Sequence, residues 1–195
     1  MQPHTHKEEV TRFCGHVAAY TFDRSKSSKD SMIQRTEARK SLCPECVEKL
    51  IGWLSTTETK AYPIQLPDIV GTTKSAPWAR QVRAKELAKY APIMQVLSAN
   101  ANDPLARAAL AAYNLLFTIE SAKFWIDNRF FKYDRWWLTS EISSLVKDEE
   151  RFGVKYADYS AYGHYRNSGN GLIAKARREA NWNSEEPELK AVSGL

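Results

Sequence analysis

The chain has 195 residues, of which 43% are hydrophobic, 26% charged and 11% aromatic. At about 150 residues per domain, this length predicts one domain or one domain with a small module, and the composition excludes an intrinsically disordered chain. The net charge of +5 permits nucleic-acid binding and excludes a protein that imitates DNA with massed carboxylates. No apolar run approaches the roughly 18 residues of a membrane span and the first residues lack a signal-peptide pattern, so we expect a cytoplasmic protein.

The sequence divides into four segments. Residues 1–60 contain all three cysteines and three of the four histidines. Residues 61–73 predict an extended linker, because Pro63 and Pro67 each disfavour helix in the residue before them. Residues 74–152 predict a helical domain, and residues 153–195 predict a Tyr- and Gly-rich segment with a basic helix and a loose tail. The expected fold is mainly α, with a small N-terminal zinc-knuckle α+β module (a short hairpin plus helices) joined to a helical domain.

The N-terminal segment contains the strongest site signal. A strand is expected over residues 17–22 and helices over residues 28–39 and 46–54. Cys14-Gly15-His16 and Cys43-Pro44-Glu45-Cys46 together supply three thiolates and one imidazole, the ligand types of tetrahedral zinc sites. Because four protein ligands leave no open coordination position, the sequence predicts a structural zinc ion bound by Cys14, His16, Cys43 and Cys46.

Other interpretations of these residues stay open at this stage. The cysteines can be reduced, buried thiols with His16 at the surface, or Cys43 and Cys46 can form a redox dithiol. His4 or His6 can replace His16 as a ligand, although neither lies in a turn with a cysteine.

Helix start and stop signals divide the third segment. A helix is expected to begin at Ser75 and to end or kink at Pro92, and a second one is expected from Asp103 to about Asp127. A third candidate helix begins at Ser140. We expect Trp78 and Trp125 to lie in the core between helices.

Aromatic and basic residues after the second helix are the candidates for recognition. The run 130–137 either closes the core, anchors a protein partner or stacks on nucleic acid. Tyrosines recur every third residue from 156 to 165, which predicts one face of a tight or polyproline-like helix. The expected partner-binding residues are Arg129, Phe131, Lys132, Tyr133, Arg135, Trp136, Tyr159, Tyr162, Tyr165 and Arg166, and the alternative nucleic-acid contacts are Lys175, Arg177 and Arg178.

Two further segments, 66–83 and 121–129, carry a family resemblance when they are taken with the Cys-Gly-His and Cys-Pro-Glu-Cys turns. Their order resembles that of a loose family of bacterial and phage proteins with a zinc knuckle, an LPxLxGSxKQxxWAxxIR segment and an AKxWIDxR segment. This chain departs from the pattern at residues 69–70, 72–73 and 75 and keeps Trp78, Arg80 and Arg83. The resemblance implies a shared scaffold and a mobile-element or prokaryotic origin, and it assigns no catalytic residue.

The functional expectation follows from these features. The sequence lacks a phosphate-binding glycine loop, a His-Glu-x-x-His motif and a nucleophile elbow, which disfavours an enzyme of a recognisable type. We therefore expect a non-enzymatic zinc protein of a mobile element that docks on a host protein or nucleoprotein complex in the bacterial cytoplasm, for example an anti-CRISPR or other anti-defence protein. The alternatives are direct nucleic-acid binding and an enzyme of unrecognised type.

Overall fold

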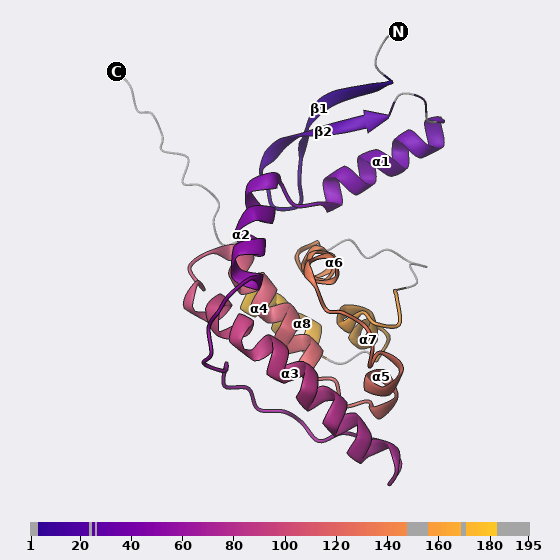
Figure 1. Cartoon of the computed structure of the whole chain (residues 1–195). Coiled ribbons are helices and arrows are strands. Elements are labelled where there is room, and N and C mark those ends of the chain that lie inside the picture. Colours follow the sequence, from indigo (N-terminus) through magenta and orange to yellow (C-terminus); the bar gives the residue numbers. More distant parts are fainter. Residues whose placement is uncertain (1–3, 24, 26, 148–155, 169–170, 183–195) are drawn as a thin grey trace.

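The computed structural model describes residues 4–23, 25, 27–147, 156–168 and 171–182 (Figure 1). Within these residues, a two-stranded antiparallel sheet is followed by eight helices. The expected mainly α fold with a small α+β module at its N-terminus is therefore confirmed. The predicted loose tail falls on residues 183–195, outside the described part. None of the described helices combines the length and apolar composition needed to cross a bilayer.

The N-terminal module consists of a hairpin and one helix. Strands β1 (Thr5–Thr11) and β2 (Val17–Asp23) pair with Thr5 opposite Asp23 and Thr11 opposite Val17. Helix α1 (Ser28–Lys40) packs against them, and its N-cap residue is Ser27, whose side chain accepts a hydrogen bond from the Asp30 N–H. The core that hairpin and helix share is small, and its buried members are Val10, Phe22 and Ala38.

A buried arginine compensates for this small core. Arg12 is 5% exposed, and its Nη1 donates to the Ala38 carbonyl at 3.0 Å and to the Ser41 hydroxyl at 2.7 Å. Its Nη2 donates to the Ala19 carbonyl at 2.8 Å, and the guanidinium lies over the Tyr20 ring. One side chain thus ties the hairpin to the end of α1, a role that nothing in the sequence pattern indicated.

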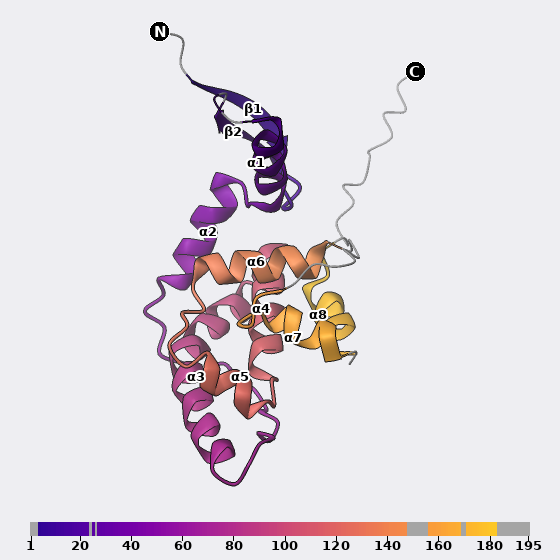
Figure 2. The ribbon, with the colours of Figure 1, turned by 90° about the vertical axis from the view of Figure 1, so that its right-hand side faces the viewer.

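Helix α2 (Pro44–Leu54) leads from the module to the remaining helices, where it contacts α3 (Ser75–Ala99), α4 (Pro104–Phe117) and α6 (Arg135–Val146). Figure 2 shows α6 on the side of the helical part that faces the module. Helix α4 is the centre of the core, and its alanines allow α3, α6 and α8 (Leu172–Ala180) to approach closely. The main core continues without a break from Phe13 and Leu50 to Leu138.

In this region one helix prediction was wrong, and of the end or kink expected at Pro92 the end does not occur. Helix α3 does not end near Pro92 but continues to Ala99, because packing along its length outweighs the single missing N–H. The linker lies against it there, with the Tyr62 N–H donating to the Ala91 carbonyl at 3.0 Å. The long helix expected over 103–127 is divided into α4 and α5 (Ala122–Asp127), and Ser121 caps the second with its hydroxyl.

The break between α4 and α5 exists because the linker pairs with it. The Val70 N–H donates to the Glu120 carbonyl at 2.7 Å, and the Ala122 N–H donates to the Val70 carbonyl at 3.0 Å. A Cβ on Gly71 would lie 2.6 Å from the Ala122 Cβ, so only glycine permits this approach. The two segments that carry the family resemblance, 66–83 and 121–129, are therefore neighbours in the fold.

The contacts between the linker and α3 also hold Arg83 in place. Of the two tryptophans expected in the core, one is buried and the other is exposed. Arg83 is 5% exposed and donates to the Pro67 carbonyl at 2.6 Å, which holds the linker against α3. Trp125 is 1% exposed and donates to the Ile119 carbonyl at 2.8 Å, as expected for a core residue. Trp78 is 48% exposed, so its placement in the core was wrong.

The last helices also differ from expectation at their starts. Helix α6 begins at Arg135 and not at Ser140, because Asp134 accepts hydrogen bonds from the N–H groups of Trp136 and Trp137. Helix α7 (Ala161–Ser168) is an α-helix, so the three-residue tyrosine period does not describe one tight or polyproline-like helix.

Candidate metal centre and binding surfaces

The turn between β1 and β2 holds Cys14 and His16. It is closed by two backbone hydrogen bonds, from the Arg12 N–H to the His16 carbonyl at 2.9 Å and from the Gly15 N–H to the Arg12 carbonyl at 3.0 Å. Gly15 has φ of +80°, a conformation that residues with a side chain adopt rarely. The glycine therefore lets both neighbouring side chains point to the same side of the turn.

The first turn of α2 holds Cys43 and Cys46. Cys43 is the N-cap residue, and its sulfur accepts a hydrogen bond of 3.4 Å from the Cys46 N–H. Pro44 at the first helical position requires no hydrogen-bond acceptor and fixes the backbone. The capping geometry brings the two thiols together at the helix N-terminus, where the helix dipole stabilises a thiolate.

Together the two turns form one four-residue cluster. The ligand atoms of Cys14, His16, Cys43 and Cys46 all lie within 4.8 Å of one another. His16 Nδ1 is 3.3 Å from the sulfurs of both Cys43 and Cys46. Zinc–sulfur bonds of about 2.3 Å and zinc–nitrogen bonds of about 2.0 Å give tetrahedral edges of about 3.5 Å between sulfur and nitrogen. The cluster is thus compatible with a metal site, and the three cysteines form no disulfide.

The charge state of the cluster also suits a cation. A hydrogen bond from Cys46 and the backbone N–H groups of Cys43 and His16 lower the pKa of Cys14 to about 4, although burial opposes this. The same hydrogen bond, together with burial, raises the pKa of Cys46. The Cys14 thiol therefore ionises more readily than the Cys46 thiol, and a bound cation favours the thiolate form of both.

The alternative histidine ligands lie elsewhere. His6 Nε2 is 3.1 Å from Glu8 Oε1, and its ring stacks on Phe22. His4 is exposed at the start of the described chain. Among the described residues, the ligand cluster contains His16 as its one histidine.

The aromatic run 130–137 is divided between core and surface. Tyr133 and Trp137 are buried, whereas Phe130 is 83% exposed and Trp136 is 71% exposed. Phe131 is partly buried and stacks on Tyr159 with ring centroids 4.0 Å apart. The run is therefore part core and part surface, and the ring of Tyr133 lies where a partner has no access to it.

The other expected partner-binding residues are likewise divided between buried and exposed positions. Tyr162 and Tyr165 are buried, and the Tyr165 hydroxyl donates to Thr118 Oγ1 at 3.2 Å. Tyr159 is 40% exposed. Arg135 lies over the exposed Trp136 ring, 4.3 Å from its centroid. Arg129, Lys132 and Arg166 are exposed.

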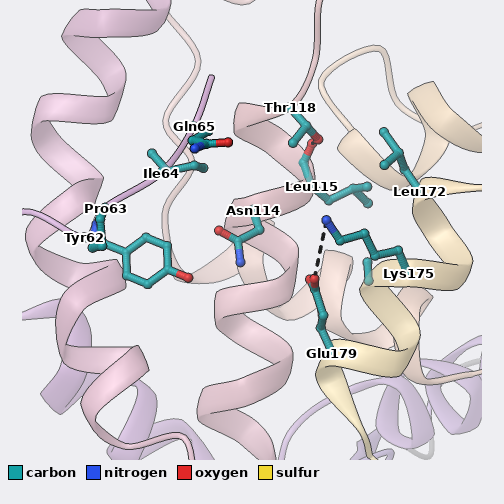
Figure 3. Close-up of a pocket in the computed structure, with 11 residues that line it drawn as sticks. Tyr62, Pro63, Ile64, Gln65, Asn114, Leu115, Thr118, Leu172, Lys175 and Glu179 are labelled. Atoms are coloured by element: carbon teal, nitrogen blue, oxygen red, sulfur yellow. Dashed lines mark hydrogen bonds and ion pairs between the residues drawn. The ribbon is translucent and has the colours of Figure 1, made fainter. Parts of the chain in front are cut away.

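The three basic residues of α8 do not form one surface. The Arg177 guanidinium is held inside the fold, donating to the Leu145 carbonyl at 3.1 Å and to the Tyr162 hydroxyl at 3.2 Å. Lys175 lies 3.8 Å from Glu179 and lines a pocket of about 390 Å³ between the linker, α4 and α8 (Figure 3). Arg178 is exposed. Arg177, the middle one of these three residues, therefore donates its hydrogen bonds within the fold and does not contribute to an exposed basic patch that could bind phosphates.

A groove of about 630 Å³ separates the module from α6. Tyr20 and Lys40 line it from the module, and Trp136 and Lys147 line it from α6 and its end. Lys147 also joins the two walls, since its ammonium group donates to the Arg39 carbonyl at 3.2 Å. Trp136 thus lines a concave surface that the module forms on one side and α6 on the other.

Comparisons with protein-family models, with curated proteins and with solved structures find no match to this chain. The site is therefore interpreted from its own geometry, and the family resemblance stays a prediction.

Proposed function

We propose that the metal of the four-residue cluster is zinc and that its role is structural. Three sulfurs and one imidazole nitrogen are a ligand set that zinc favours, and four protein ligands leave no position for a substrate or a reactive water. The ion would connect the hairpin turn to α2 at a place where the module's own core is small. Binding energies of structural zinc ions, on the order of 10 kcal/mol, are sufficient to hold such a module in place.

We further propose that the protein has no enzymatic activity and acts by docking on a protein or nucleoprotein complex. The observation that carries this proposal is Trp136, which is 71% exposed and lines the groove between the module and α6. Exposed tryptophans with neighbouring arginines are typical anchors of protein interfaces, and Arg135 lies over this ring. Since the zinc ion would hold one wall of the groove, metal binding and partner binding would depend on each other.

The resemblance to phage and bacterial proteins gives this proposal its biological setting. It suggests a partner in the cytoplasm of a bacterial host cell, and inhibition of a defence complex, as by an anti-CRISPR protein, is one instance. Direct nucleic-acid binding is less favoured, because Arg177 donates its hydrogen bonds within the fold and Lys175 lies beside Glu179.

Affinity capture from bacterial lysate tests the docking function. The wild-type chain is compared with Trp136→Ser and with Met32→Ser, a control that removes another exposed apolar side chain, from α1. One protein complex should be captured by the wild type and the control, survive nuclease treatment, and be lost with Trp136→Ser or after zinc removal. Capture that nuclease abolishes, with affinity that falls steeply as salt rises, would identify a nucleic-acid-binding protein instead. Capture of nothing would contradict the proposal.

A further inference from the structure

A second exposed aromatic surface lies away from the groove residues. The guanidinium of Arg129, just after α5, lies against two rings, 5.6 Å from the centroid of Trp78 and 4.6 Å from that of Phe130. Trp78 belongs to α3, so residues far apart in the sequence meet here. We call these three residues the arginine–aromatic patch.

The guanidinium of the patch is held in place before any partner arrives. Arg129 Nη1 donates to the Ile126 carbonyl at 2.8 Å. The bridge between Val70 and Ser121 fixes α5 relative to the start of α3. A side chain that is already ordered loses less conformational entropy on binding, so this arginine is well suited to an interface.

The patch is also open to a ligand. Phe130 is 83% exposed and Trp78 is 48% exposed. Within the part of the chain that the structure describes, no carboxylate pairs with Arg129, and the neighbouring Asp127 pairs with Lys123. Arginine carries five N–H donors, and the Ile126 carbonyl accepts from one of its terminal nitrogens. The remaining donors can bind both oxygens of a carboxylate.

We propose, on the basis of the docking function above, that the arginine–aromatic patch binds an acidic segment of the protein partner. A partner Asp or Glu carboxylate pairs with Arg129, and apolar side chains beside it cover Trp78 and Phe130. A nucleic acid fits less well, because a phosphate backbone requires a row of cations and the patch itself contains one.

A displayed library of random 12-residue peptides, panned against the purified zinc-loaded chain, tests this inference. Enriched peptides should combine Asp or Glu with apolar residues. A labelled enriched peptide should bind Arg129→Gln and Phe130→Ser at least about tenfold more weakly, as expected for anchor residues. Arg80→Ala, which removes another exposed arginine from α3, should leave the affinity within about twofold. Arg129→Lys should also bind weakly, because an ammonium group lacks the planar fork of donors.

The results that would contradict this inference can be told apart. A library without enrichment, enriched peptides without acidic residues, or equal binding to Arg129→Gln would overturn the inference. A labelled oligothymidine that binds at physiological salt and requires Arg129 would overturn it in favour of nucleic acid. If Arg129→Gln captures the lysate complex as well as the wild type does, this inference fails while the docking function stands.

Discussion

The carboxylate of Glu141 on α6 accepts a hydrogen bond of 2.7 Å from the backbone N–H of Tyr162 in the first turn of α7. Glu141 is 2% exposed, and burial raises its pKa to about 7 although Tyr162, Ser160 and Ala161 all donate hydrogen bonds to it. A buried acid therefore joins two helices and changes its charge near neutral pH.

The first prediction concerns pH. Because burial disfavours the ionised carboxylate, the folded chain binds more protons than the unfolded chain between about pH 4.5 and pH 7. The stabilisation that Glu141 contributes through its raised pKa is complete below about pH 4.5 and is lost as pH rises through 7. This loss lowers the free energy of unfolding by about 3 kcal/mol. Urea unfolding of the wild type and of Glu141→Gln at each pH measures this, since glutamine keeps an acceptor oxygen and cannot ionise.

The free energy of unfolding of the wild type minus that of Glu141→Gln should fall as pH rises from about 4.5 to about 7. Comparing two chains at the same pH cancels the effect of protons on the metal ligands, which both chains share. Glu9→Gln, an exposed acid on β1, serves as the control, and its curve should parallel that of the wild type. Parallel curves for wild type and Glu141→Gln would show that the carboxyl group does not titrate differently on folding.

The second prediction concerns the metal. The purified chain should contain one zinc ion, and His16→Ala should bind zinc roughly 100- to 1,000-fold more weakly, because one of four ligands contributes about a quarter of about 10–16 kcal/mol. His6→Ala, which changes a histidine outside the cluster, should keep the wild-type affinity. Competition with a chromophoric chelator measures both. A chain that contains no metal and stays equally folded after chelation would contradict the site.

Local signals in the sequence were sufficient to place the two cysteine-containing turns and the helices of the N-terminal segment. Proline beside cysteine and glycine between two ligands act within a few residues, α1 lies where the helix over 28–39 was expected, and α2 begins at Pro44, two residues before the expected start. The errors come from contacts between distant residues. Val70 pairs with Ser121 and divides the predicted long helix, and packing carries α3 past Pro92. The hydrogen bonds of Arg12, Arg177 and Glu141 have the same origin, since sequence spacing says nothing about partners that lie 21 to 32 residues away, such as Ala38, Leu145 and Tyr162.

The third prediction concerns Arg12. Arg12→Met should destabilise the chain by about 3 kcal/mol or more, because the Ala38 and Ala19 carbonyls lose a charged donor. Arg12→Lys should recover only part of this loss, because one ammonium group cannot reach the acceptors on both sides. Arg39→Met, a nearby arginine, should change stability by less than about 0.5 kcal/mol. Thermal unfolding of the zinc-loaded proteins measures all three, and an Arg12→Met chain as stable as Arg39→Met would contradict the structural role.

The last prediction compares two buried tyrosines whose hydroxyls differ in their partners. The Tyr113 hydroxyl donates to the Tyr133 carbonyl at 3.2 Å, whereas the Tyr133 hydroxyl has no hydrogen-bond partner among the described residues. Removing a satisfied hydroxyl costs about 1 kcal/mol, and removing an unsatisfied one relieves a desolvation penalty. Tyr113→Phe should therefore lower the urea midpoint, while Tyr133→Phe should leave it unchanged or raise it, with equal denaturant slopes. Equal losses in the two variants would instead mean that the Tyr133 hydroxyl has a partner such as a buried water or the unpaired oxygen of Glu86.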